Sequence, residues 1–213
     1  MLKLLSATPS PFARKVRIAL IEKQIPFELI TTNPWDLDSE AIKYNPLGKV
    51  PALILENKET IYESSFILEW LEINYPEPAL FASSKDNTLK MKQIEVLADG
   101  ISDAFILLFF ERMRPKNQQS SSWRNRQLAK VNNGMAALNA CVPKTGFCID
   151  DTFSIADISA VAVADYLSLR FKEYNWRKEY VCLSDLVDRL AERHSFQVTQ
   201  PVAQKINQIQ SSR

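Results

Sequence analysis

This sequence contains little glycine, histidine or cysteine. Its 213 residues include 4 glycines, 1 histidine and 3 cysteines. With so little glycine, and with 46% hydrophobic and 24% charged residues, the composition excludes a fibrous or disordered chain and is that of a globular protein. Cys141, Cys148 and Cys182 include no CxxC pair, and His194 has no cysteine neighbour. The sequence therefore predicts neither a disulfide framework nor a metal site.

The sequence also lacks a charge excess of either sign and a long apolar run. Lys and Arg number 26 against 25 Asp and Glu, so no overall field attracts nucleic acid or an anionic membrane. Apolar stretches such as residues 158–169 include Asp165 and fall short of the about 20 residues of a membrane span. Residues 1–10 lack the charged start and apolar run of a signal peptide. We expect a cytoplasmic protein without nucleic-acid or membrane partners.

The first part of the chain alternates between strand and helix patterns. Apolar and β-branched runs predict strands at residues 2–7, 27–32, 50–55 and 60–62, the last two forming a hairpin. Pro11 opens an amphipathic helix whose charged side includes Lys15, Arg17 and Lys23. A second helix over residues 64–75 has Phe66 and Leu71 on one apolar face and ends before Pro76.

The rest of the chain shows helical patterns and no further strand of useful length. The helical runs are residues 86–113, 118–141, 155–171 and 184–192. This change marks a domain boundary near residue 80. We predict an α/β domain at residues 1–77, a linker at 78–84 and an all-helical domain at 85–213, with a loosely held polar tail from residue 204.

The segment Thr8-Pro9-Ser10-Pro11-Phe12 places a hydroxyl between the first strand and the first helix. Unpaired backbone N–H groups and the helix dipole favour an anion there, so Ser10 could stabilise a thiolate. A serine before proline is also typical of an ordinary helix N-cap. The local sequence leaves both interpretations open.

Two further segments have the chemistry of a ligand site. Residues 45–51 (Asn-Pro-Leu-Gly-Lys-Val-Pro) end in Pro51, and a cis bond there would turn the preceding backbone toward a ligand. The alternative is a simple edge-strand start. Glu63 and Ser64 place a carboxylate and a hydroxyl at the start of the second helix, which suits an amino acid's ammonium and carboxylate groups or, alternatively, plain capping.

Together these segments resemble the N-terminal domain of the serine-type cytosolic glutathione transferases. Residues 154–157 (Ser-Ile-Ala-Asp) resemble the capping box in that family's second domain, and residues 97–104 resemble the bacterial YibF-like subgroup. The resemblance covers nearly the whole chain. It implies the GST fold: a thioredoxin-like βαβ-ββα domain with a mixed four-stranded sheet, followed by an all-α helical bundle.

The resemblance also implies that glutathione is a substrate and gives each matching residue a role. Ser64 would bind the γ-glutamyl carboxylate, and Glu63 would bind the ammonium of the same residue. The Val50 backbone, beside a cis Pro51, would bind the cysteinyl amide. Lys49 would bind the glycyl carboxylate. Ser10 would be the catalytic residue that donates a hydrogen bond to the sulfur. Ser6 is its rival, although Ser6 lies inside the predicted strand. Because this position holds serine and not cysteine, disulfide reduction is disfavoured.

A pocket for the second substrate is expected between Phe12 and the inner face of helix 86–113. Phe105, Phe109 and Arg112 are its candidate walls, although aromatic residues at helical spacing also fit an ordinary core. Asp99 could reach the glutathione ammonium of a neighbouring subunit, as an acid does in some family members, or it could be a solvated or capping residue. A stripe of Arg14, Lys15 and Arg17 is expected to be solvated or to face another subunit, and phosphate binding is the less favoured alternative.

Two functions are compatible with this resemblance. The first is an enzyme, expected as a homodimer, that conjugates glutathione to small electrophiles. The second is a binding or regulatory protein on the same fold, without the chemistry. The complete set of Ser10, Lys49, Pro51, Glu63 and Ser64 favours the enzyme, because a scaffold has no physical need for all of them.

Overall fold

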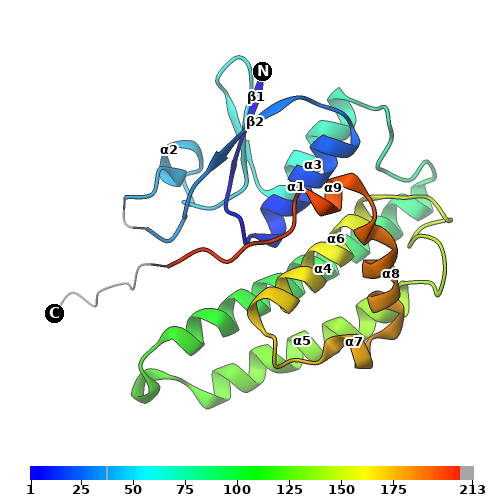
Figure 1. Ribbon diagram of the computed structural model, residues 1–213. Helices are drawn as coiled ribbons and strands as arrows, with labels where there is room; N and C mark the ends of the chain where they lie inside the picture. Colours follow the sequence, from blue (N-terminus) through cyan, green and yellow to red (C-terminus); the bar gives the residue numbers. More distant parts are fainter. Residues whose placement is uncertain (37, 207–213) are drawn as a thin grey trace. The chain divides into compact units, whose positions relative to one another are not determined.

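The computed structural model describes residues 1–36 and 38–206 and divides the chain into two units (Figure 1). The first unit comprises Met1–Pro78 together with the chain from Pro201 onward, and the second comprises Ala79–Gln200. Residues 201–206 thus group with the N-terminal unit, whereas the sequence places them in the helical domain. Of the tail predicted to be loose, Gln204 and Lys205 are hydrogen-bonded to the first unit, and residues 207–213 lie outside the described residues.

The first unit is built on a mixed sheet with the strand order β2-β1-β3-β4. Its strands are β1 (Leu2–Ser6), β2 (Phe27–Thr31), β3 (Ala52–Ile54) and β4 (Thr60–Tyr62). β1 runs parallel to β2 and antiparallel to β3, and β4 runs antiparallel to β3. The mixed four-stranded sheet is therefore confirmed. β3 is shorter than predicted because Pro51, which has no N–H to donate, precedes it.

Three helices complete this unit: α1 (Pro11–Glu22), α2 (Ala41–Tyr44) and α3 (Ser64–Asn74). α1 and α3 pack against each other. On α3 the buried residues include Ile67, Leu68 and Leu71, whereas Phe66, which was predicted to share one apolar face with Leu71, is 50% exposed. Both sides of α3 carry apolar residues at helical spacing, and the sequence pattern therefore does not distinguish the inner side from the outer.

The predicted solvated stripe on α1 is also wrong. Arg14, Lys15 and Lys23 are all buried. Arg17 is partly buried, and this burial, together with the charge of Arg14, lowers the pKa of Arg17. At the end of α1, the Lys23 ammonium donates to the backbone oxygens of Tyr75 (2.7 Å) and Pro78 (2.9 Å). It also pairs with Glu72 at 2.7 Å. Its long side chain thus ties α1 to the end of α3, which explains why a lysine is buried there.

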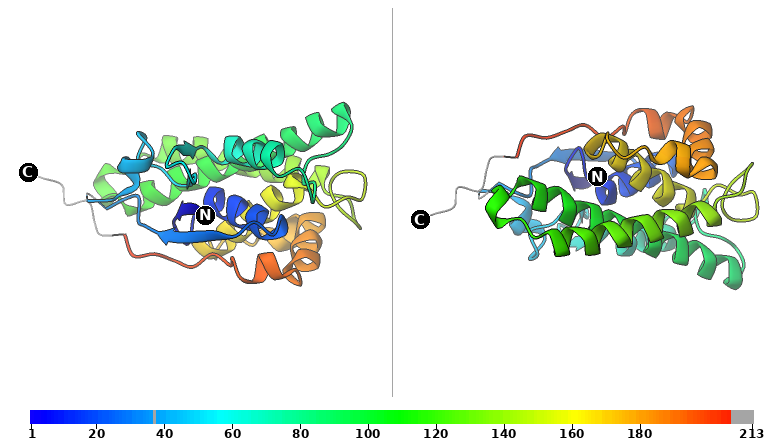
Figure 2. Two further views of the ribbon diagram at one scale, coloured as in Figure 1. Left: turned by 90° about the horizontal axis from the view of Figure 1, so that it is seen from above. Right: turned by 90° about the horizontal axis from the view of Figure 1, so that it is seen from below.

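The second unit is helical throughout its described elements. They are α4 (Lys85–Met113), a 3-10 helix at Lys116–Gln118, α5 (Ser121–Cys141), α6 (Ile155–Arg170), α7 (Trp176–Glu179), α8 (Val181–Ala191) and α9 (His194–Gln197). α4 packs on α5 and α6, and Figure 2 shows α4 and α5 side by side. Residues 155–164 of α6 are all buried, so α6 is the central helix of this unit. The sequence missed α7 and α9, because four residues are too few to show a helical period.

No helix within the described residues combines the length and the hydrophobicity that crossing a bilayer requires.

Candidate functional site

Ser10 lies at the start of α1, where its side chain caps the helix. The Ser10 Oγ accepts a hydrogen bond from the Ala13 N–H at 3.2 Å, and the Ser10 N–H donates to the Ala7 oxygen at 3.1 Å, closing a turn. The capping interpretation is thus confirmed. It leaves the other open, because a hydroxyl that accepts through oxygen keeps its own proton to donate. Ser6 is buried within β1.

The segment 45–51 is held in shape by Asn45. This buried side chain donates to the Lys49 oxygen at 3.0 Å and accepts from the Leu47 N–H at 2.9 Å. Gly48 has a φ of 62°, a left-handed conformation that favours glycine. The Val50–Pro51 peptide is cis, as predicted, and the Lys49 side chain is exposed. The structural role of Asn45 was missed, although Asn before Pro is a turn signal.

Glu63 caps α3 from an unusual backbone conformation. Its φ is 77°, a region that non-glycine residues seldom adopt and that recurs at functional sites. Its Oε2 accepts from the Ser65 and Phe66 N–H groups, both at 3.1 Å, and from the Ser65 hydroxyl at 2.6 Å. The Ser64 hydroxyl, nearly fully buried, donates to Oε1 at 3.4 Å. The hydrogen bonds that cap the helix thus reach Oε2, and Oε1 can accept a hydrogen bond from another donor.

The hydrogen bonds to Glu63 control its ionisation. Partial burial opposes the charged form, but the hydrogen bonds from Ser65 and Phe66, helped by the charge of Lys15, outweigh that effect. The pKa of Glu63 therefore lies below the usual glutamate value. The site offers a fixed negative charge at neutral pH.

The sheet register brings these three segments to one edge. Leu5 of β1 pairs with Ala52 of β3, and Ala52 pairs with Tyr62 of β4. Because neighbouring strands in this set are antiparallel, the end of β1, the start of β3 and the end of β4 lie next to one another. Pro51 directly precedes Ala52 and Glu63 directly follows Tyr62, and Ser10 ends the short loop that follows β1. The structure thus places the predicted glutathione-contacting residues along a single edge.

The candidate residues for the second-substrate pocket have different environments. Phe105 is 1% exposed and packs on Phe171, with ring centroids 5.0 Å apart, so it is a core residue and not a pocket wall. Arg112 pairs with Glu173 at 2.5 Å and donates to the Arg170 oxygen at 2.7 Å, tying α4 to the end of α6. Its guanidinium also lies 4.1 Å from the Phe171 ring.

Phe109 is half-buried, 4.4 Å from the Arg170 guanidinium, so it keeps an accessible surface. Phe12, on α1, is half-buried as well. A pocket that joins Phe12 to Phe109 and Arg112 stays a prediction. The contact of Asp99, which is half-buried on α4, with a second subunit also stays a prediction.

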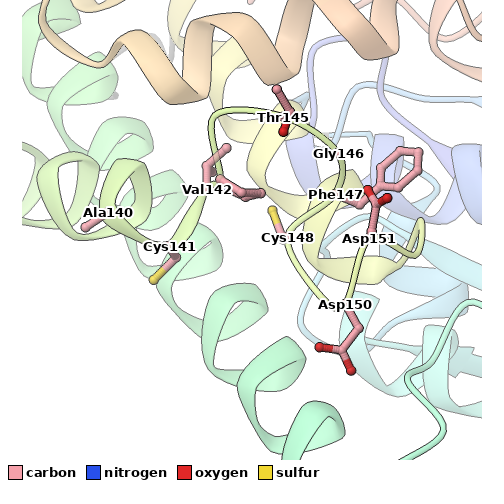
Figure 3. A pocket seen from close by; sticks show the side chains of 10 residues that line it. Ala140, Cys141, Val142, Thr145, Gly146, Phe147, Cys148, Asp150 and Asp151 are labelled. Atoms are coloured by element: carbon pink, nitrogen blue, oxygen red, sulfur yellow. The ribbon is translucent and has the colours of Figure 1, made fainter.

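The second unit contains a cavity of about 670 Å³ that the sequence did not indicate (Figure 3). It is lined by the end of α5 and the loop before α6, including Cys141, Cys148, Asp150 and Asp151. Burial, with the Asp157 charge, raises the pKa of the Cys148 thiol, which keeps it neutral and unreactive. Two carboxylates in the lining would repel an anionic ligand such as glutathione. Within the described residues, no group of three or more His, Cys, Asp or Glu could hold a metal ion.

Comparisons with known proteins identify the family of this chain. The family model of the glutathione S-transferase N-terminal domain matches residues 9–73, and that of the C-terminal domain matches residues 121–189. The uncharacterized GST-like protein YibF of Escherichia coli (strain K12) is 36% identical over 205 residues, which cover 94% of this chain and 98% of the relative. The chain belongs to the glutathione S-transferase family.

Two solved structures have the same fold. A glutathione S-transferase from Methylobacterium radiotolerans, in complex with glutathione sulfonate, is 45% identical with a TM-score of 0.95, and the match covers 97% of each chain. A second, from Methylobacillus flagellatus with glutathione bound, is 34% identical with a TM-score of 0.91 and covers 95% of this chain and all of its own. The predicted GST fold and the resemblance to YibF-like proteins are confirmed.

Proposed function

We propose that this protein is a cytoplasmic glutathione transferase that binds glutathione at the sheet edge formed by Ser10, Pro51 and Glu63. The observation that carries the proposal is the Leu5–Ala52–Tyr62 register, because it joins three loops that are distant in sequence into one site. The glutathione and the glutathione sulfonate in the two solved relatives support the same ligand.

Each part of glutathione has a matching group at this edge. The ammonium of its γ-glutamyl residue would bind the ionised Glu63 through Oε1, which accepts fewer hydrogen bonds than the capping oxygen Oε2. The adjacent carboxylate would bind Ser64 at the N-terminus of α3, where the helix dipole favours an anion. The cysteinyl amide would pair with the Val50 backbone, and the exposed Lys49 would bind the glycyl carboxylate.

Ser10 would activate the sulfur through a hydrogen bond in which its hydroxyl group is the donor and the sulfur is the acceptor. A thiol pKa of about 8.5 leaves only a few per cent thiolate at neutral pH, and lowering it by about two units requires roughly 2.7 kcal/mol. A hydrogen bond to a charged acceptor contributes about 1.5–3 kcal/mol, and a helix N-terminus adds about 0.3–1 kcal/mol. These contributions suffice without a general base. The thiolate then forms a C–S bond with an electrophilic carbon, whose leaving group departs with its electron pair.

Ser10→Ala tests this function. In an ultraviolet difference titration with glutathione near neutral pH, we expect a saturable thiolate band in the wild type and none in Ser10→Ala. Since Ser10→Ala also removes a helix cap, Ser84→Ala is the matched control, because Ser84 caps α4 through the Asn87 N–H at the same 3.2 Å. That variant should keep the band. Absence of binding in the wild type would contradict the proposal, and binding without ionisation would indicate the non-catalytic alternative.

We also propose that the protein forms a homodimer and that small electrophiles reach the thiolate near Phe12, Phe109 and Arg112. For the dimer, the supporting observation is exposed apolar surface. Phe66 and Ile73 are exposed on α3 of the first unit, and Leu89 and Val96 are exposed on α4 of the second. Leu89, Val96 and Asp99 are spaced to share one side of α4, so the predicted contact of Asp99 with a second subunit fits the same surface.

A further inference from the structure

The described end of the chain returns to the first unit and crosses two of its loops. The Thr8 hydroxyl donates to the Val202 oxygen at 2.9 Å, and the Val202 N–H donates to the Thr8 oxygen at 3.4 Å. Farther along, the Gln204 side chain donates to the Thr32 oxygen at 3.1 Å. The Asn33 side chain donates to the Lys205 oxygen, also at 3.1 Å. We call residues 201–205 the C-terminal strap.

The strap lies at the same sheet edge as the candidate glutathione site. β1 and β2 are parallel, and Ser6 pairs with Thr31, so the loops that follow these two strands leave the sheet side by side. Thr8 belongs to the first loop, and Thr32 and Asn33 belong to the second. In open α/β sheets, ligands bind at the carboxyl ends of the parallel strands. The strap therefore bridges the two loops at the binding edge.

The contact with Thr8 bears directly on Ser10. Thr8 precedes Ser10 by two positions, inside the turn that the Ser10 N–H closes on the Ala7 oxygen. Val202 engages both the hydroxyl and the carbonyl of Thr8. The turn is thus held from within by Ser10 and from outside by the strap. A catalytic hydroxyl must be held within about 0.5 Å of its productive position to be effective.

We propose that the C-terminal strap positions the Ser10 hydroxyl for the glutathione sulfur, with Thr8 as the positioning residue that transmits the contact. This inference rests on the proposed function, since it assigns the strap to the thiolate-forming step. Binding of glutathione depends mainly on Lys49, Val50, Glu63 and Ser64, none of which the strap contacts through the hydrogen bonds described above. Loss of the strap should therefore affect ionisation of the thiol more than affinity for glutathione.

The test compares a chain that ends at Gln200 with one that ends at Ile206, which keeps the whole strap. Each is titrated with glutathione over a range of pH while the thiolate band is recorded. Without the strap we expect the pKa of the bound thiol to rise by about one unit, which lowers the thiolate fraction at neutral pH about threefold, because the turn that carries Ser10 loses its outer hydrogen bonds. Affinity for glutathione should change by less than about threefold. The chain that ends at Ile206 should match the wild type.

A point substitution covers the case in which the shorter chain fails to fold. Thr8→Val keeps the shape of the side chain and removes the donor to Val202, so it should raise the pKa of the bound thiol in the same direction. Thr88→Val is its control, because the Thr88 hydroxyl likewise donates to backbone oxygens, those of Ala82 and Ser84, in the second unit. If the wild type ionises glutathione and Thr8→Val does so equally well, the strap proposal is overturned. If the wild type does not ionise it, the proposed function itself fails.

Discussion

Among single residues, Glu63 combines a helix cap with an unusual backbone conformation. It caps α3 through Oε2 while its backbone holds a φ of 77°. A residue without a Cβ would adopt this backbone conformation at lower cost. The hydrogen bonds that the carboxylate accepts from the start of α3 oppose this cost, and they are stronger when the carboxylate is ionised.

We expect the cap to make stability depend on pH. The pKa of Glu63 is lower in the folded protein than the about 4.3 of an unfolded glutamate. Ionised Glu63 thus stabilises the fold above about pH 4.3, and this contribution disappears as pH falls through the folded-state pKa. At pH 7, Glu63→Gln should lower the free energy of unfolding by about 1 kcal/mol, the usual worth of a cap at a partly solvated position. The difference should shrink at pH 3.5.

Denaturant unfolding of the wild type and of Glu63→Gln at pH 7 and pH 3.5 measures the difference in their free energies of unfolding. Glu59→Gln is the control, because Glu59 is exposed on the turn before β4 and its hydrogen bonds to other described residues are made by its backbone. A Glu63→Gln difference that stays constant between the two pH values would show that the charge of Glu63 does not stabilise the cap.

Which residues the sequence could predict depends on how local their chemistry is. The positions of Ser10, Pro51 and Glu63 at helix or strand starts followed from neighbouring prolines and polar residues. The burial of Lys23 did not, because its partners Tyr75 and Pro78 lie more than fifty positions away. The core position of Phe105 is a packing property of several helices, and its aromatic spacing fitted a pocket equally well.

At the scale of elements, the start of α6 shows what a local motif predicts and what it omits. Asp157 accepts from the Ser154 N–H at 2.9 Å and the Ser154 hydroxyl at 3.1 Å, which confirms the predicted capping box. It also accepts from the Cys148 N–H at 2.8 Å, a contact that the motif does not contain. The same carboxylate therefore fastens the preceding loop to the buried helix.

Removing this carboxylate should be costly. Asp157→Ala removes the acceptor of the buried Ser154 N–H and of the partly buried Cys148 N–H, and we expect it to lower the free energy of unfolding by about 3 kcal/mol. Asp157→Asn keeps one accepting oxygen and should cost less. Chemical denaturation followed by helical circular dichroism compares the two. Equal, small losses below about 1 kcal/mol would mean that the loop rearranges to satisfy its own donors.

On the scale of the whole molecule, exposed apolar side chains remain on both units. The sequence predicted the change from a mixed to an all-helical pattern near residue 80, because composition and period change there. It did not predict the C-terminal strap, whose contact with Thr8 joins residues 194 positions apart. No local pattern in a polar segment indicates a pairing over such a distance.

If the exposed apolar side chains of α3 belong to a dimer interface, Phe66 should contribute to it. Phe66→Ser should raise the dimer dissociation constant by about tenfold or more, because a buried interface aromatic contributes about 2 kcal/mol. Sedimentation velocity over a range of concentrations measures this. Ile42→Ser is the control, since Ile42 is an exposed apolar residue on α2. A wild type that sediments as a monomer at micromolar concentration would contradict the dimer.

The strap also orders events during synthesis on the ribosome. The first unit holds the loops that follow β1 and β2, but residues 201–205 leave the exit tunnel only after the entire helical unit has been translated. A nascent chain could therefore assemble its sheet early and still hold Ser10 loosely until translation is nearly complete. If the strap positions Ser10 as proposed, thiol activation would then begin only after the helical unit has been translated.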